Sequence, residues 1–380
     1  MRKILFITTR NPYSGRLSGD VIRSLKIINL LKKKYYLDII CLEKEKINNQ
    51  ERSLITFNQP NLILKFIYCL VSLLRLNPVQ FGLFYSGEMK RYVENFANNY
   101  DYLFFYHIRS SQYLPKNFYG KTIIEMGDLY SDNYFQTFKY LNFFNPLKYV
   151  YYFESLLVKR IENQIFENFD KIVLFSKKEI EKVKKKFKNK IFKIEESVEK
   201  ISKKFFFSKK NFRILFVGNL NYLPNLLACR DFITQIFPKI KPDLPKVKFT
   251  VIGSVSKFKK NLLSKLPDVE IIGSKKDLSK YIKNSICGLA NLKIATGMQG
   301  KVLTYMSYGL PVISSEKVSQ NFGLSVLSFK NNSDLIKKIN DLKKNKVLSN
   351  RLSKKSLQLS KQLIWSKVSR KYYKLLDFNK

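Results

Sequence analysis

The sequence predicts an α/β protein with two doubly wound domains. Short apolar runs alternate with helical patterns through the first half of the chain, which is typical of a parallel sheet with helices between its strands. The same alternation starts again near residue 212, after a basic stretch. A chain of 380 residues is long enough for two domains that each bury a core. We therefore expect a first domain over residues 1–200, a linker over 201–211 and a second domain over 212–355.

Five apolar runs are the expected strands of the first domain, at residues 4–8, 37–42, 102–106, 122–125 and 171–175. Three helical patterns lie between them, at residues 21–33, 62–74 and 149–167. The pattern at 62–74 is the most apolar of the three, but it contains Lys65 and is shorter than the roughly 20 residues that cross a bilayer. We expect no transmembrane helix.

The second domain repeats this order of elements. Its expected strands begin at residue 213 and continue at 249–252, 269–272, 288–290 and 312–314, with helices that begin near Asn225, Lys257, Asp277 and Gly300. In doubly wound sheets, ligands bind at the carboxyl ends of the strands. The tail over residues 356–380 is helical and is either an ordinary terminal helix or a clasp onto the first domain.

The chain is strongly basic. Its 70 Lys and Arg residues against 29 Asp and Glu give a formal net charge of +41. One interpretation is a compositional bias without a functional role, because the lysine excess is spread over the whole chain. The other is a basic, aromatic face formed by residues 177–193 and 203–213, where phenylalanines are interleaved. For such a face we favour an anionic membrane surface over nucleic acid, because no nucleic-acid-binding motif is present.

Location and metal content follow from the N-terminus and the cysteines. Residues 1–10 read as a buried first strand rather than a signal peptide. Four cysteines are scattered without metal-ligand or disulfide spacing, and the chain has one histidine. We expect a cytoplasmic protein with reduced thiols and no metal site.

Residues 292–315, LKIATGMQGKVLTYMSYGLPVISS, are the most informative segment. Two glycines, Gly297 and Gly300, flank Met298 and Gln299, and a helical pattern follows from Lys301. The free N–H groups and positive dipole end of a helix N-terminus suit a phosphate. A lysine in the first turn opposes the dipole at a cost of roughly 0.3–1 kcal/mol unless an anion offsets it. The alternative is a helix cap followed by a solvated lysine.

Polar residues also follow two strands of the first domain. The connection over residues 9–19 is long for its type and contains Gly15 and Gly19, which let a ligand approach the backbone, although it is also compatible with a mobile surface loop. His107 follows the strand at 102–106 directly, and Arg109 comes two residues later. Glu125 and Asp128 end the next strand, where they would bind a sugar hydroxyl or, for Asp128, cap a helix.

These segments resemble the retaining GT-B glycosyltransferases of the group 1, family 4-like type. The similarity rests on the Gly-x-Gln-x-Lys-Val-Leu run, on the first strand with Pro12, Tyr13, Gly15, Gly19 and Arg23 after it, and on the pairs Gly218-Asn219, Ile252-Gly253 and Ile272-Gly273. It implies two Rossmann-like domains that face a central cleft, with the last helix crossing back onto the first domain. It also implies transfer of a sugar from a nucleotide diphosphate-sugar, UDP- or GDP-linked, to a glycan or lipid-linked acceptor.

The resemblance assigns roles to residues in both domains. Catalytic roles fall to Lys301 and His107, with Tyr106 as an alternative for the latter. The donor would contact Gly19, Gly218, Asn219, Lys293, Thr296, Gly297, Met298, Gln299, Gly300 and Thr304. Acceptor-side positions are Arg23, Arg109, Glu125 and Asp128. No metal and no cofactor besides the co-substrate are implied.

Two threonines depart from the family pattern. Relatives mostly carry a glutamate at the position of Thr304, where it holds the nucleotide ribose, and a glutamate or arginine at that of Thr296. A threonine accepts a hydrogen bond but brings no charge. These threonines keep open a catalytically degenerate GT-B protein that binds a partner or polyanion. A nucleotide-sugar epimerase shares the GT-B scaffold and is a further alternative, although the Gly-x-Gln-x-Lys run and the absence of several expected acidic residues disfavour it.

Overall fold

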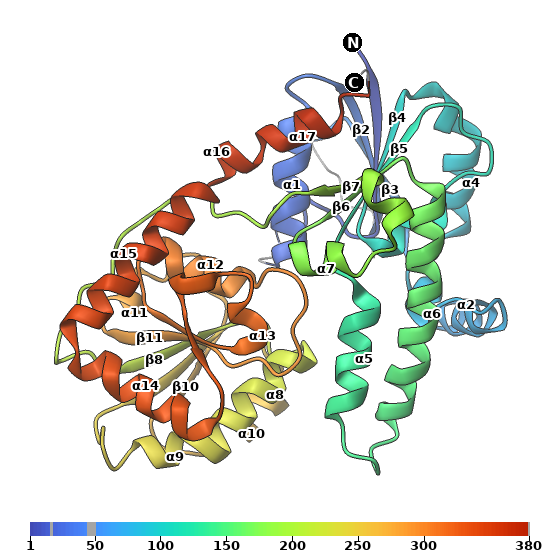
Figure 1. The fold of residues 1–380 in the computed structure, drawn as a ribbon. Coiled ribbons are helices and arrows are strands. Elements are labelled where there is room, and N and C mark those ends of the chain that lie inside the picture. The colour runs from blue at the N-terminus through green and yellow to red at the C-terminus, as the bar shows by residue number, and fades with distance from the viewer. Residues whose placement is uncertain (16–17, 44–50, 379–380) are drawn as a thin grey trace. The chain divides into compact units, whose positions relative to one another are not determined.

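The computed structural model describes residues 1–15, 18–43 and 51–378, which form two compact units (Figure 1). Unit 1 comprises Met1–Ile194 and Tyr372–Lys380, and unit 2 comprises Glu195–Lys371. Each unit contains one parallel sheet with its own hydrophobic core. The predicted α/β class with two doubly wound sheets is confirmed.

The sheet of unit 1 has seven strands in the order β3-β2-β1-β4-β5-β6-β7, all paired in parallel. Their bounds are β1 Lys3–Thr8, β2 Tyr36–Glu43, β3 Leu54–Asn58, β4 Tyr102–Tyr106, β5 Lys121–Gly127, β6 Lys171–Leu174 and β7 Ile191–Lys193. The five predicted strands are present. The sheet order reverses between β1 and β4, where Thr8 pairs with Tyr106 at the carboxyl ends. Doubly wound sheets bind ligands at such a reversal.

Helices cover both faces of this sheet (Figure 1). They are α1 Gly19–Leu31, α2 Leu62–Leu74, α3 Val79–Leu83, α4 Gly87–Phe96, α5 Tyr130–Tyr140, α6 Leu147–Asn168 and α7 Lys177–Glu181, with short 3₁₀ turns at Ala97–Asn99, Ile108–Tyr113 and Lys185–Lys190. The three predicted helices correspond to α1, α2 and α6. Among the described residues, no helix combines the length and the apolar character needed to cross a bilayer.

Unit 2 has a six-stranded parallel sheet in the order β10-β9-β8-β11-β12-β13. Its strands are β8 Arg213–Val217, β9 Lys248–Ile252, β10 Val269–Ile272, β11 Ser285–Ala290, β12 Val312–Ser315 and β13 Leu327–Phe329. Its helices are α8 Leu223–Asp231, α9 Phe237–Ile240, α10 Lys257–Leu263, α11 Ser279–Ile282, α12 Gly300–Ser307, α13 Glu316–Ser319, α14 Asn332–Lys344, α15 Lys346–Gln362 and α16 Trp365–Val368, with a π-helical turn at Phe232–Ile236 and a 3₁₀ turn at Gly323–Ser325. The order reverses between β8 and β11, which places the loops after both strands at a second potential ligand site.

The two units divide at a different place from the predicted linker. Residues 201–211 pack on unit 2, where Phe205 is buried and the backbone N–H of Ser202 donates to the carbonyl oxygen of Ser307 at 2.9 Å. The division therefore falls between Ile194 and Glu195.

The tail also divides differently from our expectation for residues 356–380. Its first part, with α15 and α16, belongs to unit 2. The last helix, α17 Arg370–Leu375, carries the chain into unit 1, to which residues from Tyr372 onward belong.

Candidate active site

In unit 2, the loop after β11 leads into the N-terminus of α12. Gly297 turns the loop with a φ of 56°, a conformation that favours glycine, and its carbonyl oxygen accepts a hydrogen bond from Asn321 Nδ2 at 2.5 Å. The side chain of Gln299 donates to the carbonyl oxygen of Thr296 at 2.8 Å. No side chain caps the helix at Gln299. The first turn is therefore left without a side-chain cap, and uncapped N–H groups at a helix N-terminus can bind an anion.

Lys301 lies in this first turn with neutral partners. Its Nζ donates to Asn225 Oδ1 at 2.5 Å and lies 4.1 Å from the ring centroid of Phe216. Among the described residues, no carboxylate forms an ion pair with it. Burial lowers the pKa of Lys301 to about 7, because these neighbours replace water without supplying a negative charge. A bound anion would favour the charged ammonium.

Asn225, in the first turn of α8, holds this lysine in place. Its Nδ2 donates to the carbonyl oxygen of Asn219 at 2.9 Å, while its Oδ1 accepts from Lys301. A Cβ on Gly218 would come within 2.9 Å of that Nδ2, so a side chain at Gly218 would displace Asn225. The sequence analysis missed Asn225. A polar residue in the first turn of the helix after Gly218-Asn219 is the signal that could have found it.

The other donor-side candidates are distributed around α12. Thr304 Oγ1 donates back to the carbonyl oxygen of Gly300 at 3.0 Å, one turn earlier in the same helix. Met298 packs against the hydrophobic core of unit 2. Lys293 forms an ion pair with the buried Asp231 at 3.0 Å, so its charge is already compensated.

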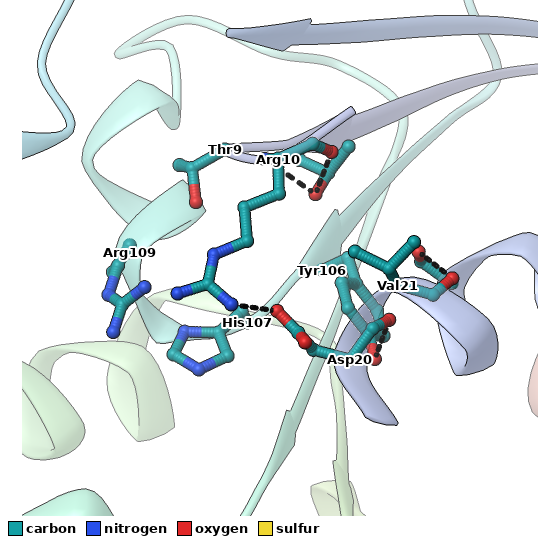
Figure 2. Close-up of a pocket in the computed structure, with 9 residues that line it drawn as sticks. Thr9, Arg10, Asp20, Val21, Tyr106, His107 and Arg109 are labelled. Carbon is teal, nitrogen blue, oxygen red and sulfur yellow. Dashed lines mark hydrogen bonds and ion pairs between the residues drawn. The ribbon is translucent and has the colours of Figure 1, made fainter. Parts of the chain in front are cut away.

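In unit 1, a pocket lies where the carboxyl ends of β1 and β4 meet the start of α1 (Figure 2). It is lined by Thr8, Thr9, Arg10, Asp20, Val21, Ser24, Tyr106, His107 and Arg109. Arg10 forms an ion pair with Asp20, and the hydroxyl of Tyr106 donates to the backbone carbonyl oxygen of Asp20 at 2.9 Å. Gly19, the first residue of α1, leaves open space where a Cβ would point. Residues 16 and 17 of the predicted loop lie outside the described residues.

His107 has an unusual backbone conformation at this pocket. Its φ of 74° and ψ of 149° lie close to a region that is essentially restricted to glycine. Hydrogen bonds hold this conformation: its N–H donates to the Glu125 carbonyl oxygen at 2.8 Å, and its carbonyl oxygen accepts from the N–H of Ser110 at 3.0 Å. Strain that is retained in this way often marks a functional residue.

The side chain of His107 is neutral and has an unsatisfied ring nitrogen. Its ring centroid lies 4.6 Å from that of Tyr130, and its Nδ1 is buried without a hydrogen-bond partner. Burial, together with the positive charges of Arg109 and Arg10, holds the pKa of His107 well below its usual value. A neutral imidazole can accept or donate one hydrogen bond at each nitrogen, according to its tautomer.

Arg109, two residues after His107, also lines the pocket. Its Nε donates to Gln80 Oε1 at 2.9 Å and its guanidinium lies 4.4 Å from the ring centroid of Phe84. Burial and the charge of Arg10 lower the pKa of Arg109. The pocket therefore has a surplus of positive charge.

Arg23 and Glu125 do not line this pocket, contrary to our expectation for acceptor-side residues. Their side chains are only 3% and 1% exposed, and Arg23 Nε donates to Glu125 Oε1 at 2.5 Å. The hydroxyl of Tyr372, from α17, donates to Glu125 Oε2 at 2.5 Å. A buried acid and a buried base satisfy each other here, which leaves neither free for a substrate.

Asp128, at the end of β5, lies next to another carboxyl group. Burial and the negative charge of Asp128 raise the pKa of Glu179, whose Oε1 accepts from the N–H of Leu129 at 2.8 Å. Asp128 does not line the pocket of unit 1 either. In the described part of the chain, no group of three or more His, Cys, Asp or Glu side chains could hold a metal ion.

The two sheets and their order define a protein of the GT-B class, and solved structures with this fold match the whole chain. TarM from S. aureus is 11% identical, with a TM-score of 0.66 over 99% of this chain and 98% of that one. HepE from Anabaena, in complex with UDP and glucose, is 12% identical, with a TM-score of 0.65 over 99% of both chains. WaaG, a glycosyltransferase involved in lipopolysaccharide biosynthesis, is 10% identical, with a TM-score of 0.66 over 99% of this chain and 100% of that one. At such identities the similarity establishes the fold.

The sequence of unit 2 matches a known family. Residues 211–345 match the family model of the glycosyl transferases group 1. A search of the curated proteins finds no match. The segment that carries Lys301 and Asn225 thus matches the group 1 glycosyltransferases. Over the whole chain, the predicted GT-B fold is confirmed.

Proposed function

We propose that this glycosyltransferase moves a sugar from a nucleotide diphosphate-sugar to a hydroxyl of a glycan or lipid-linked acceptor, with retention of configuration. The observation that carries the proposal is the placement of Lys301. It is a buried lysine with neutral partners, held by Asn225 at an uncapped helix N-terminus, in the segment that matches the group 1 family. A diphosphate supplies the missing negative charge.

The diphosphate binds at the start of α12 in this proposal. The N–H groups after Gly297 and the ammonium of Lys301 stabilise the charge that develops on the leaving diphosphate. The bond between the anomeric carbon and the diphosphate oxygen breaks. The acceptor oxygen forms its bond on the same face of the sugar, and its proton passes to the departing phosphate oxygen. This reaction needs no protein nucleophile, so catalysis rests on charge stabilisation and positioning.

Unit 1 contributes the recognition of the transferred sugar and the acceptor. Its pocket offers the neutral ring of His107, the open backbone at Gly19 and the guanidinium of Arg109. Each can bond a hydroxyl, and the cationic surplus would also suit an acceptor that carries phosphate. All four cysteines are free thiols, three of them buried, which supports a location in the reducing cytoplasm.

A UDP-hexose is the first donor to test. HepE has been solved in complex with UDP-glucose, and its fold covers 99% of this chain. GDP- and ADP-linked sugars complete the panel, because the contacts proposed here are to the diphosphate and do not select a base. Without a known acceptor, water serves as a slow one.

The test measures release of nucleoside diphosphate from each donor, with the anomeric configuration of the released sugar followed by NMR. The wild type is expected to use at least one donor and to release the sugar first as the anomer present in that donor. Lys301→Ala is expected to lower kcat by about 10²–10³-fold or more, the loss typical of a missing group that stabilises developing charge. Lys257→Ala is the matched control, because Lys257 is the exposed first residue of another helix in the same unit.

Three outcomes would count against the proposal. Wild-type turnover by Lys301→Ala would remove Lys301 from the mechanism. A donor that returns with an inverted hydroxyl and an intact diphosphate would indicate an epimerase. If no donor binds or reacts, the chain is a degenerate GT-B protein, the alternative that Thr296 and Thr304 suggest.

A further inference from the structure

In helix α2 of unit 1, the large apolar side chains face outward and the more polar ones face the protein. Its one buried residue is the polar Ser72. The side toward the protein carries Lys65, Tyr68, Cys69 and Ser72 at helical spacing. The outer side carries large apolar side chains that are 40% to 84% exposed: Leu62, Ile63, Leu64, Phe66, Ile67, Leu70, Leu73 and Leu74. A helix in contact with water normally has the opposite arrangement.

A second apolar surface lies on the hairpin of α5 and α6, which pack along each other (Figure 1). At the tip between them, Phe143 is 67% exposed and Phe144 is 89% exposed. Down the outer side of α6, the spacing i, i+4, i+7 brings Tyr149, Phe153 and Leu156 into one exposed stripe. Exposed apolar surface of this extent marks an interaction site.

The two surfaces adjoin each other within unit 1. Arg160, the next position of the stripe on α6, donates from Nη1 to the carbonyl oxygen of Leu76 at 3.5 Å, just beyond the end of α2. The N–H of Val79 donates to Glu154 Oε1 at 2.7 Å. We call the exposed apolar residues of α2 and of the α5–α6 hairpin together the apolar face.

The exposed charged residues within the apolar face are positive, and the acid between its two surfaces, Glu154, is buried. Residues 59–87 contain Lys65 and Arg75 and no acid, and residues 133–153 contain Lys139 and Lys148 and no acid. A self-complementary contact between two copies would bring these cations together without compensating carboxylates. An anionic lipid surface compensates them and accepts the apolar side chains at the same time.

We propose that the apolar face docks the protein on an anionic membrane, with α2 lying in the interface and the tip of the α5–α6 hairpin inserted. At 13 residues α2 is too short to cross a bilayer and suits an in-plane position. Phe143, Phe144 and Tyr149 are the kind of aromatic side chains that gather at the headgroup level. The proposal does not depend on the transferase activity.

The basic runs that we first expected to bind a membrane lack this combination. Of the phenylalanines interleaved with the lysines at residues 177–193 and 203–213, Phe206 is 61% exposed, whereas Phe187 and Phe205 are buried. Those runs therefore offer charge without much apolar surface for insertion. Salt distinguishes the two modes of binding, since it screens charge and leaves apolar insertion largely intact.

The first test is flotation of the full chain with vesicles of phosphatidylcholine and phosphatidylglycerol, and with vesicles of phosphatidylcholine alone. The wild type is expected to prefer the anionic vesicles and to retain part of its binding at about 0.5 M NaCl, where the Debye length is roughly 4 Å. Two variants that remove apolar side chains are each expected to weaken partitioning into the vesicles at least about tenfold. One combines Phe143→Ser with Phe144→Ser, and the other combines Ile63→Gln, Phe66→Gln and Leu70→Gln.

Two control variants distinguish insertion of the apolar face from nonspecific binding through other exposed apolar side chains and from binding through charge. Phe258→Ser with Leu262→Gln removes exposed apolar side chains from α10 of unit 2, where Phe258 is 77% and Leu262 51% exposed. It is expected to bind as the wild type does. Lys184→Gln with Lys185→Gln and Lys188→Gln removes charge from one of the basic runs and is expected to leave the salt-resistant part of binding unchanged. Thermal unfolding of every variant checks its fold.

The second test follows insertion directly. Trp365 is the one tryptophan of the chain. Phe144→Trp in a Trp365→Phe background is expected to show blue-shifted emission and quenching by brominated lipid, whereas Phe258→Trp in the same background is not. Equal vesicle binding by the apolar-face variants, or a Phe144→Trp signal that vesicles leave unchanged, would overturn the proposal. A wild-type dimer that these variants dissociate, without vesicle binding, would identify a second copy of the chain as the occupant.

Discussion

Lys301 is an amine that the fold buries without a counter-charge. Its pKa is lowered from 10.5 to about 7 because Phe216 and Asn225 withdraw it from water. Between these two pH values the unfolded chain holds a proton at this lysine that the folded chain does not. The free energy of unfolding should therefore rise as pH rises from about 7 toward 10.5.

Denaturant unfolding across this range checks the sign. Lys301→Met removes the titrating group, so its stability should rise less steeply with pH than that of the wild type. The difference between the two proteins cancels the contributions of all other groups. Parallel stability profiles would show that Lys301 titrates as an ordinary solvated lysine.

His107 combines a strained backbone with a side chain placed for binding. Glycine relieves the backbone strain, which costs about 1–3 kcal/mol for such conformations, whereas alanine keeps it. Both substitutions lose the ring contact with Tyr130. His107→Gly should therefore be more stable to denaturant than His107→Ala by about 1 kcal/mol or more.

Both variants should also lose transferase activity, since neither offers a ring nitrogen to the substrate. Activity near that of the wild type in either one would make His107 a structural residue. An alanine variant at least as stable as the glycine variant would remove the strain from the interpretation.

Thr304 tests whether the ribose lies where the family resemblance places it. Its hydroxyl is bonded to the helix backbone at Gly300, so it offers the ribose little in its present rotamer. Thr304→Glu should tighten nucleoside diphosphate binding by about 1–3 kcal/mol, the range for a hydrogen bond to a charged group. Thr304→Gln has the same size without the charge and should gain less. Weaker binding by Thr304→Glu in calorimetry would mean that the ribose lies elsewhere.

At the scale of elements, α17 ties the end of the chain to the core of unit 1. Tyr372 donates to Glu125 and accepts from Arg23 Nη2 at 2.9 Å, which completes the hydrogen bonds of a buried ion pair. Tyr372→Phe leaves these charged groups one partner short and should lower the free energy of unfolding by about 1–3 kcal/mol. Denaturant unfolding of the wild type and the variant measures this difference in the free energy of unfolding.

The neighbouring Tyr373 provides a matched control for this prediction. Its hydroxyl reaches the carbonyl oxygen of Leu30 at a longer 3.4 Å, from a partly exposed position. Tyr373→Phe should therefore cost clearly less. Equal effects of the two substitutions would show that the ion pair does not need Tyr372.

The elements that the sequence analysis found are those with strong apolar patterns. The central strands β1 and β4 are continuously apolar and buried, and they were predicted within a residue of their bounds. The edge strands β3 and β13 are only partly buried and carry no such run, so they were missed. Helix α5 was missed because its buried residues, Ser131 and Thr137, are polar.

The site was predictable where its residues are close in sequence. The turn at Gly297 and the helix start at Lys301 form one local motif. The contact of Asn225 with Lys301 joins positions 76 residues apart, and that of Arg23 with Glu125 joins positions 102 apart. A single sequence does not show which distant polar residues will pair, and this is why Asn225 was missed and Arg23 was assigned to the acceptor.

At the scale of the whole molecule, the charge of +41 and the apolar face act on different partners. The surplus of lysine gives long-range attraction to any polyanion, including nucleotide sugars and anionic lipids. Selectivity has to come from local structure. For the donor we assign it to the start of α12, and for a membrane to α2 and the α5–α6 hairpin.

Calorimetry of UDP, GDP and ADP binding tests the assignment of the donor site most directly, with wild type, Lys301→Met and the control Lys257→Met. Because an anion favours the charged form of Lys301, binding near pH 8 should take up a proton, seen as heats that differ between buffers of different ionisation enthalpy. One nucleotide should bind the wild type and Lys257→Met with proton uptake, whereas Lys301→Met should bind it at least about tenfold more weakly, without uptake. Failure of all three nucleotides to bind the wild type, or binding by Lys301→Met with unchanged affinity and uptake, would contradict the assignment.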